Sequence, residues 1–266
     1  MQHLFQSWDS FATDVKAAAH VLLLSDYDGT LTPIVGRPQD AILPPEVREK
    51  LGALAKRRSF SIGIISGRSL SAVKALVGLE GIYYAGNHGL EIAGPGLKFV
   101  HPEAKKAQVV IRELARQFLA GLGRLEGVIM EDKGLSLSVH YRLVPPDKVK
   151  DVERIFQQIT APAVRKGNIR VTTGKKVLEV RPPIDWDKGK AVETIIKEIK
   201  ALLKVEQLLT IYLGDDTTDE DAFRILHRPQ GWSIFVGQDG KLSRADYFLS
   251  STSEVAAFLS RLLELK

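Results

Sequence analysis

Short apolar runs that end in polar residues recur along this sequence. Residues 21–24 read VLLL, residues 61–65 read SIGII and residues 208–213 read LLTIYL. Runs of this length that do not alternate are typical of strands buried on both faces, as in a parallel sheet covered by helices. The pattern therefore predicts an α/β fold in which these strands deliver polar turns to one edge of a sheet.

Apolar positions at helical spacing fill most of the chain between these strands. Helices are expected at residues 4–15, 45–56, 69–77, 187–203 and 253–263. Ser253 is the expected cap of the last helix. Further strands are expected at residues 82–85, 231–236 and 247–249. Proline and glycine interrupt residues 31–43, which predicts a loop there.

The middle of the chain has a different pattern. It predicts the order helix, strand, strand, helix, strand, strand, at residues 104–119, 127–131, 135–142, 147–159, 169–172 and 177–180. Within residues 135–142 apolar and polar side chains alternate, which indicates an antiparallel sheet with one covered face. We therefore expect an inserted α+β domain at residues 104–182, with residues 1–103 and 183–266 forming the core domain around it.

Two acids follow the first apolar run. Asp26 and Asp28 stand two residues apart, so their side chains point to the same side of an extended backbone, and Gly29 then permits a sharp turn. An ordinary Asp-Gly turn is the simpler interpretation of this stretch taken alone. At the carboxyl end of a strand, however, two carboxylates are costly unless a cation or proton neutralises them. A positively charged partner is expected here.

Polar residues follow other strands in the same way. They are Ser66, Gly67, Arg68, Asn87, His88, Asp215 and Asp216. Simpler explanations exist for several of them, because an arginine can pair with a surface acid and a histidine between glycines is common in turns. Likewise, Thr217 and Glu220 fit a capping box for a helix that starts near Thr217.

Net charge, cysteine content and the length of apolar runs limit the classes of function that are expected. The net charge is +5 but the basic residues are scattered, so nucleic acid is not an expected partner, whereas an anionic small molecule is. The absence of cysteine excludes disulfides, zinc thiolate sites and cysteine nucleophiles. The first twenty residues lack the pattern of a signal peptide, and no apolar run approaches the ~20 residues of a membrane helix. We expect a cytoplasmic monomer without a membrane partner.

The polar strand ends and a nearby lysine form a recognisable set. Carboxylates at separate strand ends suit Mg²⁺, which takes oxygen ligands, and serine and lysine beside them suit a phosphoryl group. From the residues alone, Lys188 and Lys190 are equivalent candidates. The set resembles the haloacid dehalogenase-like phosphatases, whose four motifs stand here in order as DYDGT, the serine of IISGR, the lysine of WDKG, and GDD. The resemblance covers the whole chain and selects Lys188.

This resemblance implies a Rossmann-like parallel-sheet hydrolase core with an inserted cap domain. It implies that Asp26 attacks phosphorus, and that Asp28 protonates the departing oxygen and later deprotonates water. Mg²⁺ would be held by Asp26, the main-chain carbonyl of Asp28, and Asp215. Lys188 counts among the catalytic residues.

Other motif residues receive supporting roles from the same resemblance. Ser66, Gly67 and Lys188 would hold the phosphoryl oxygens. Asp216 and Asp219 would act through water or by orienting Lys188.

Finer features resemble one branch, the trehalose-6-phosphate phosphatases. These are YAGNHGLEI, EDKGLSLSVHYR, VLEVRP before WDKG, and YLGDDTTDEDAF. The resemblance implies that the substrate, a sugar phosphate, is contacted by Arg68, Asn87, His88, Glu131, Lys133 and Glu179. The roles of His140 and Arg142 stay open.

Two alternatives differ from this reading. A sibling phosphatase for sucrose 6-phosphate or glucosyl-3-phosphoglycerate would share the core and differ in the cap. A phosphosugar sensor without activity should have lost Asp26, Asp28 or Lys188, and all three are present.

Overall fold

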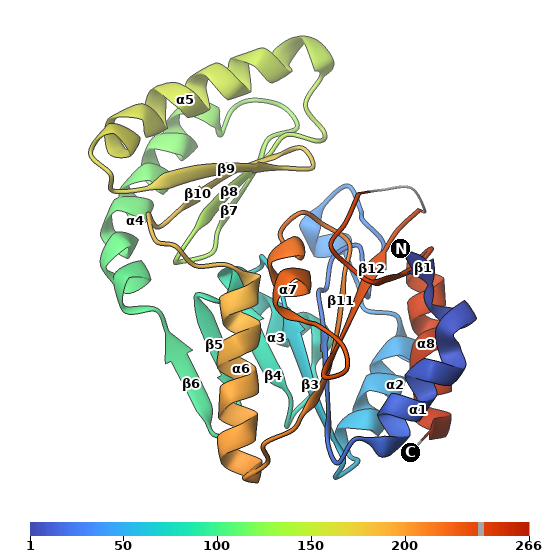
Figure 1. Cartoon of the computed structure of the whole chain (residues 1–266). Helices are drawn as coiled ribbons and strands as arrows, with labels where there is room; N and C mark the ends of the chain where they lie inside the picture. Colours follow the sequence, from blue (N-terminus) through green and yellow to red (C-terminus); the bar gives the residue numbers. More distant parts are fainter. Residues whose placement is uncertain (239–241, 266) are drawn as a thin grey trace. The chain divides into compact units, whose positions relative to one another are not determined.

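A computed structural model describes residues 1–238 and 242–265 of the chain. The chain divides into two compact units. The core unit holds residues 1–99 and 186–266, and the inserted unit holds residues 100–185. Figure 1 follows the chain out of the core unit, through the inserted unit and back. None of the described helices has both the length and the apolar composition needed to cross a membrane.

The core unit is built on a mainly parallel sheet. Among the described residues it has nine strands in the order β1-β13-β12-β11-β2-β3-β4-β5-β6. Their bounds are β1 (Gln2–His3), β2 (Val21–Ser25), β3 (Phe60–Ile65), β4 (Tyr83–Gly86), β5 (Glu91–Gly94), β6 (Leu97–Val100), β11 (Leu209–Gly214), β12 (Gly231–Val236) and β13 (Tyr247–Leu249). Pairing is parallel from β1 through to β4, and β5 is antiparallel to β4. Because β2 lies between β11 and β3, the residues that follow these strands meet at one edge.

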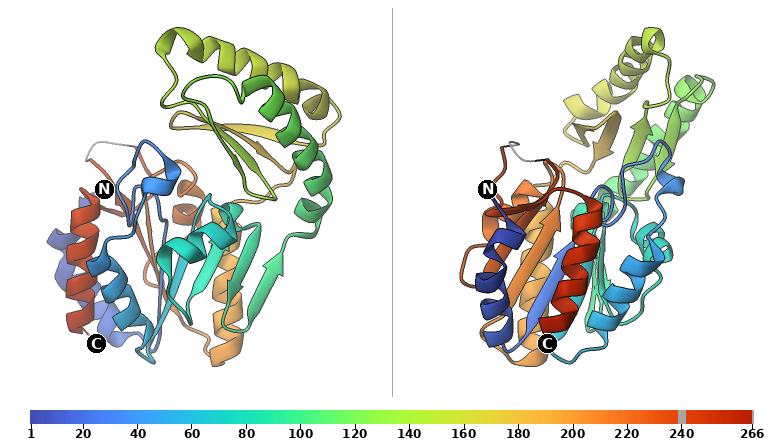
Figure 2. Two further views of the ribbon diagram at one scale, coloured as in Figure 1. Left: turned by 180° about the vertical axis from the view of Figure 1, so that it is seen from behind. Right: turned by 90° about the vertical axis from the view of Figure 1, so that its right-hand side faces the viewer.

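Helices cover both faces of this sheet (Figure 2). They are α1 (Trp8–Ala17), α2 (Pro45–Ala55), α3 (Leu70–Val77), α6 (Lys188–Leu203), α7 (Glu220–Ile225) and α8 (Thr252–Leu265), with 3-10 turns η1 (Leu4–Ser7), η2 (Pro38–Asp40) and η3 (Asn87–Gly89). Strand β2 serves both layers: Val21 and Leu23 pack with α1, α2 and α8, whereas Leu22 and Leu24 pack with α6 and α7. The predicted α/β class with a buried parallel sheet is confirmed.

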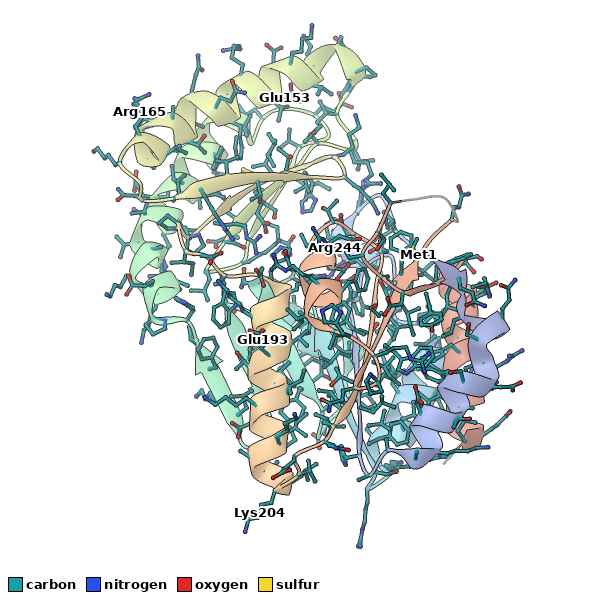
Figure 3. All side chains as sticks on the ribbon, in the orientation of Figure 1. Met1, Glu153, Arg165, Glu193, Lys204 and Arg244 are labelled. Atoms are coloured by element: carbon teal, nitrogen blue, oxygen red, sulfur yellow. The ribbon has the colours of Figure 1, made fainter. Side chains whose placement is uncertain are left out.

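The inserted unit is an antiparallel sheet with helices on one face. Its sheet has the order β7-β8-β10-β9. The elements are α4 (Pro102–Leu122), β7 (Ile129–Asp132), β8 (Leu137–His140), η4 (Pro146–Lys148), α5 (Val149–Arg165), β9 (Arg170–Gly174) and β10 (Val177–Arg181). Leu137 and Val139 join the apolar core with the helices, as their alternation with Ser136 and Ser138 predicts. Charged residues such as Arg165 on α5 are exposed, as Glu193 is on α6 of the core unit (Figure 3).

Several local predictions are wrong. No element was predicted at residues 91–100, where the structure has strands β5 and β6. The capping box at Thr217 does not form: α7 begins at Glu220, whose carboxylate accepts hydrogen bonds from Ser243 Oγ at 2.6 Å and Arg244 N–H at 2.7 Å. Ser253 lies inside α8, and Ser251 Oγ instead accepts from Glu254 N–H at 3.3 Å.

Candidate active site

Acidic side chains converge at the carboxyl edge of the core sheet. Asp26 follows β2, and Asp215 follows β11 beside it; the Asp26 N–H continues the strand ladder by donating to Leu213 O at 2.9 Å. Carboxylate oxygens of Asp26, Asp215 and Asp219 all lie within 4.8 Å of one another, and all three residues are buried. Such a set of hard oxygen donors, away from bulk water, fits a small divalent cation.

Both carboxylate oxygens of Asp219 accept hydrogen bonds. Its Oδ1 accepts from Lys188 Nζ at 2.7 Å and from Tyr212 Oη at 2.7 Å, and its Oδ2 accepts from the N–H groups of Asp215 and Asp216 at 3.1 and 3.0 Å. A carboxylate offers about four lone-pair sites, so these donors saturate it. Asp219 is therefore built to hold Lys188 and the turn after β11.

Lys188 connects the two acids across the site. Its ammonium donates to Asp26 Oδ1 at 2.6 Å and to Asp219 at 2.7 Å, and its side chain is 2% exposed. The lysine is the first residue of α6, whose cap is Asp187, accepting from Lys190 N–H at 2.9 Å. The cap explains why the aspartate of WDKG precedes the lysine, because it fixes where the helix begins.

Burial sets the protonation of this cluster. Removal from water raises the pKa of Asp26 well above its ordinary value, against the opposing charge of Lys188. Burial also works against the charged form of Lys188, but Asp219 and Asp26 overcome it and raise the pKa of the amine. The network therefore keeps Lys188 as an ammonium, and burial followed by the charge of Asp219 raises the pKa of Tyr212 well above its ordinary value.

Gly29 is required where the chain leaves the acid pair. Its φ is +91°, and a Cβ there would lie 2.3 Å from Asp215 Oδ2. Any side chain would displace the Asp215 carboxylate, so the glycine of DYDGT makes room for the acid of GDD.

Asp28 is bound by Arg68. Arg68 Nε donates to Oδ2 at 2.7 Å and Arg68 Nη2 donates to Oδ1 at 2.6 Å, and Nη2 also donates to Pro38 O at 2.8 Å. The side chain of Arg68 is 9% exposed, whereas that of Asp28 is 39% exposed. The arginine is thus the buried support, and the acid is the open end of the pair.

The segment after β3 lies against the turn after β4. Ser66 Oγ accepts from Arg68 N–H at 3.2 Å, and His88 N–H donates to Ser66 O at 2.9 Å. A Cβ on Gly67 would lie 2.8 Å from the His88 ring. Asn87 and His88 both have positive φ, at 50° and 56°, which is strained for residues other than glycine. Asn87 is held there by its Nδ2 donating to Glu91 Oε1 at 2.7 Å.

The inserted unit carries its own polar cluster on the face of its sheet opposite the helices. Glu179 Oε1 accepts from Lys133 Nζ at 3.0 Å, and more weakly from Ser138 and Ser136 at 3.4 and 3.5 Å. Arg181 Nε lies 3.7 Å from Oε2 of the same acid. Separately, Glu131 lies 3.1 Å from His140 Nε2. The structure thus brings Lys133 to Glu179, and it pairs His140 with Glu131.

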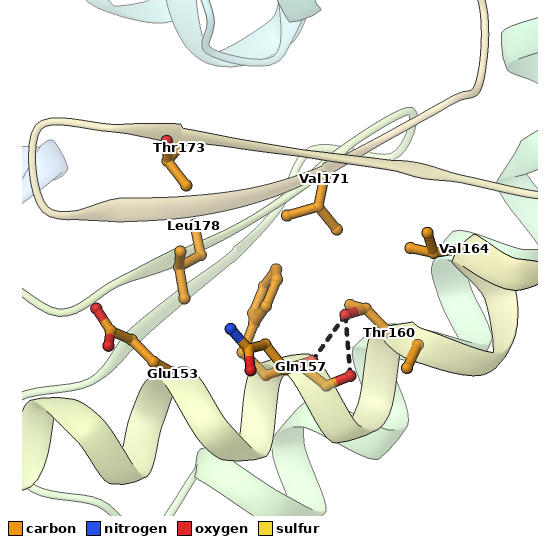
Figure 4. A pocket seen from close by; sticks show the side chains of 9 residues that line it. Glu153, Gln157, Thr160, Val164, Val171, Thr173 and Leu178 are labelled. Atoms are coloured by element: carbon orange, nitrogen blue, oxygen red, sulfur yellow. Dashed lines mark hydrogen bonds between the residues drawn. The ribbon is translucent and has the colours of Figure 1, made fainter.

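A hollow of about 500 Å³ opens on the other face of this small sheet (Figure 4). It lies between α5 and strands β9 and β10, with Phe156, Val171 and Leu178 among its lining residues. Glu179 points to the opposite face from Leu178, because side chains alternate along a strand. None of the predicted site residues lines this hollow.

Comparison with known proteins agrees with the geometry. The sequence model of the trehalose-phosphatase family matches residues 24–253. The chain belongs to the trehalose-phosphatase family. Trehalose-phosphatases are phosphoric monoester hydrolases. The fold of this chain also resembles that of a haloacid dehalogenase-like hydrolase from Bacteroides thetaiotaomicron, with a TM-score of 0.63 and 16% identity.

Individual relatives of this family match nearly the whole chain. A probable trehalose-phosphate phosphatase D from Arabidopsis thaliana is 38% identical over 265 residues, which are 95% of this chain and 70% of the relative. A probable trehalose-phosphate phosphatase 2 from Oryza sativa is 37% identical, over 92% of this chain and 68% of the relative. Among solved structures, the C-terminal domain of the Candida albicans trehalose-6-phosphate phosphatase has a TM-score of 0.81 and 26% identity, covering 97% of each chain.

Sequence reasoning did not single out Tyr212 or Glu91. Tyr212 stands in an apolar strand, where a tyrosine is ordinarily read as core, and only the contact with Asp219 gives it a role. Glu91 follows the YAGNHG stretch and supports Asn87 from four residues away. An amide and an acid four residues apart in a glycine-rich turn are the signal that could have indicated the contact between Asn87 and Glu91.

Proposed function

We propose that this protein hydrolyses trehalose 6-phosphate to trehalose and phosphate through a phosphorylated aspartate, with Mg²⁺ as cofactor. The observation that carries the proposal is the buried Asp26, held at 2.6 Å by Lys188 and grouped with Asp215 and Asp219. Membership of the trehalose-phosphatase family supplies the substrate.

The chemistry divides into two displacements. In the first, an Asp26 oxygen forms a bond to phosphorus while the bond from phosphorus to the sugar oxygen breaks, and Asp28 gives its proton to that oxygen. In the second, Asp28 takes a proton from water as the water oxygen attacks phosphorus, which releases phosphate and restores Asp26. Lys188 holds Asp26 in place and offers positive charge to the phosphoryl group.

The residues present fit a divalent cation. Asp26 and Asp215 would hold it through carboxylate oxygens, with the main-chain carbonyl of Asp28 as a further ligand, whereas the oxygens of Asp219 already accept four hydrogen bonds. When bound, Mg²⁺ would offset the negative charge shared by the carboxylates and the phosphate. Asp219 and Asp216 would keep the turn and Lys188 in position.

Ser66 and Gly67 would bind the phosphoryl oxygens beside Lys188. A Cβ on Gly67 would collide with the His88 ring, so the glycine lets this histidine pack against the turn after β3, which brings the two predicted site residues together. Asn87 and His88 would contact the substrate from the strained turn.

The inserted unit would act as the cap that selects the sugar. Glu179 and Lys133 form a buried acid–amine pair, and Glu131 with His140 forms a half-buried pair of carboxylate and imidazole. Carboxylates and ammonium groups exchange such hydrogen bonds readily for those of sugar hydroxyls. The domain boundaries at residues 103 and 183 stay a prediction.

Phosphate release from trehalose 6-phosphate, sucrose 6-phosphate and glucosyl-3-phosphoglycerate, with and without Mg²⁺, tests the substrate. Preference for either of the last two would contradict the proposal. Labelled phosphate should be trapped on the Asp28→Asn variant with nitrophenyl phosphate and never on Asp26→Asn; label on Asp26→Asn would refute the nucleophile.

A further inference from the structure

We propose that Arg68 positions Asp28 for proton transfer to the leaving group, instead of contacting the substrate. The inference rests on the proposed function, since it assigns a support to the acid and base of that reaction. Two N–H donors of the Arg68 guanidinium bind the two carboxylate oxygens of Asp28, at 2.7 and 2.6 Å, and this paired contact is called the fork below. Paired, charge-assisted bonds of this kind fix the plane as well as the position of a carboxylate.

The support itself is fixed on several sides. Arg68 Nη2 also donates to Pro38 O at 2.8 Å, and its guanidinium lies 5.5 Å from the centre of the buried Tyr27 ring. Its main-chain carbonyl accepts from Asn87 N–H at 2.7 Å. A guanidinium held in this way has little freedom to turn toward a ligand.

The acid has freedom that the arginine lacks. The Asp28 side chain is 39% exposed, against 9% for Arg68. When Asp28 carries a proton, one oxygen bears the O–H and can donate it, while the other still accepts from Arg68. In the proposed step the proton leaves that oxygen for the sugar oxygen as its bond to phosphorus breaks. The carboxylate left behind then regains the second bond of the fork.

The position of the arginine also explains the sequence. Arg68 follows Ser66 by two residues, so one turn after β3 supplies both the expected phosphate contact and the support of the acid after β2. Lysine would not replace it, because a single ammonium cannot bind both oxygens in one plane.

A series of aryl phosphates of similar size separates positioning from other roles. Release of the aryl alcohol from 4-nitrophenyl, phenyl and 4-methoxyphenyl phosphate is measured in a single turnover, so that only the first displacement is counted. The nitrophenolate needs little protonation, and the methoxyphenolate needs most. Arg68→Ala should leave the first substrate nearly unchanged and slow the last by about 10²-fold, the scale of general acid catalysis.

Two further variants, Tyr27→Phe and Arg68→Lys, serve as controls for the Arg68→Ala measurement. Tyr27→Phe removes the hydrogen bond of 2.8 Å from Tyr27 Oη to Ala41 O and leaves the two hydrogen bonds between Arg68 and Asp28 in place. This variant shows the effect of a disturbed loop at residues 31–43. It should change the rates of all three aryl phosphates by the same small factor. Arg68→Lys keeps the charge and loses the fork, so it should show a weaker version of the same trend, and it carries the test if Arg68→Ala does not fold.

An equal loss by the Arg68 variants on all three substrates, or no loss, would overturn the proposal. A raised KM with an unchanged trend across the series would also overturn it, since that result assigns Arg68 to substrate binding. Failure of the proposed function is seen separately, as a wild-type enzyme that cleaves aryl phosphates but not trehalose 6-phosphate.

Discussion

Two buried lysines in this molecule each pair with an acid, and they do so in different ways. In the core unit, Lys188 lies 2.6 and 2.7 Å from two carboxylates, and one of these, Asp219, also accepts from a tyrosine and two main-chain N–H groups. In the inserted unit, Lys133 lies 3.0 Å from Glu179, which also accepts from two serine hydroxyls at 3.4 and 3.5 Å and lies 3.7 Å from Arg181 Nε.

The difference separates a fixed site from an adaptable one. Main-chain donors after β11 cannot move without moving the strand, so Asp219 and Lys188 hold one geometry, as catalysis needs. The donors to Glu179 named above are side chains, and the two serine hydroxyls stand at the long end of hydrogen bonding, so they rotate at little cost. Such a cluster can exchange its partners for sugar hydroxyls, as recognition needs.

Removal of divalent cations should give the largest effect, and it should act through the core alone. We expect chelation to abolish turnover of trehalose 6-phosphate and of nitrophenyl phosphate equally. Cation binding, followed by calorimetry, should weaken as the pH falls. The reason is the raised pKa of Asp26: its carboxylate takes up a proton at higher pH than an ordinary aspartate, and only the carboxylate binds the cation. Full activity after thorough chelation would contradict the metal assignment.

The sequence predicts which acids meet at the edge of the core sheet. It does not predict the individual side-chain pairs or the bounds of the short elements. Asp26 and Asp215 were expected together because apolar strands of a parallel sheet end at one edge, whatever their separation in the chain. The pairing of Arg68 with Asp28 depends on a side-chain direction across 40 residues, which no periodicity reports. Strands β5 and β6 were missed because each has only four residues and most of these are partly exposed, so their apolar pattern is weak. The start of α7 was misplaced because Asp219 serves the site instead of a regular cap.

A matched pair of lysine variants tests the contrast directly. Lys188→Met should slow turnover of both nitrophenyl phosphate and trehalose 6-phosphate by about 10²–10³-fold, because a charge fixed beside the phosphoryl group is lost. Lys133→Met should spare nitrophenyl phosphate, which is too small to need the sugar contacts. If the two variants lose activity on nitrophenyl phosphate to the same degree, the division into a catalytic and a recognition cluster is wrong.

Truncation of the acids in the inserted unit should give a smaller and selective loss. Glu179→Ala and Glu131→Ala should each weaken catalysis on trehalose 6-phosphate by about 1–3 kcal/mol, the range for hydrogen bonds to charged groups. Steady-state kinetics on both substrates gives the measurement, with nitrophenyl phosphate as the internal control. Equal losses on both substrates would mean that these acids support the fold, and no loss on either would mean that the sugar binds elsewhere.

The smallest expected effect is on stability, at the partly exposed pair of Glu254 and His3, which is far from either lysine in sequence. Glu254, at the start of α8, accepts from Ser250 N–H at 2.7 Å and lies 2.9 Å from His3 Nε2 on β1. Burial opposes the charge, but these hydrogen bonds lower the pKa of Glu254 below its ordinary value of 4.5. A lowered pKa in the folded state means stability that is present above the ordinary value and lost as the pH falls through the folded one.

Glu254→Gln should therefore reduce the free energy of unfolding at neutral pH by about 0.5–1 kcal/mol, a figure kept low because the side chain is partly open to water. The difference from wild type should shrink as the pH falls below 4.5, where the glutamate of the wild-type protein becomes neutral as well. Urea unfolding of both proteins across that range makes the measurement, with Glu193→Gln on the exposed face of α6 as the control that should show no such change. A difference that stays constant with pH would mean that Glu254 contributes through packing and not through its charge, and the anchoring of β1 would then rest on its pairing with β13.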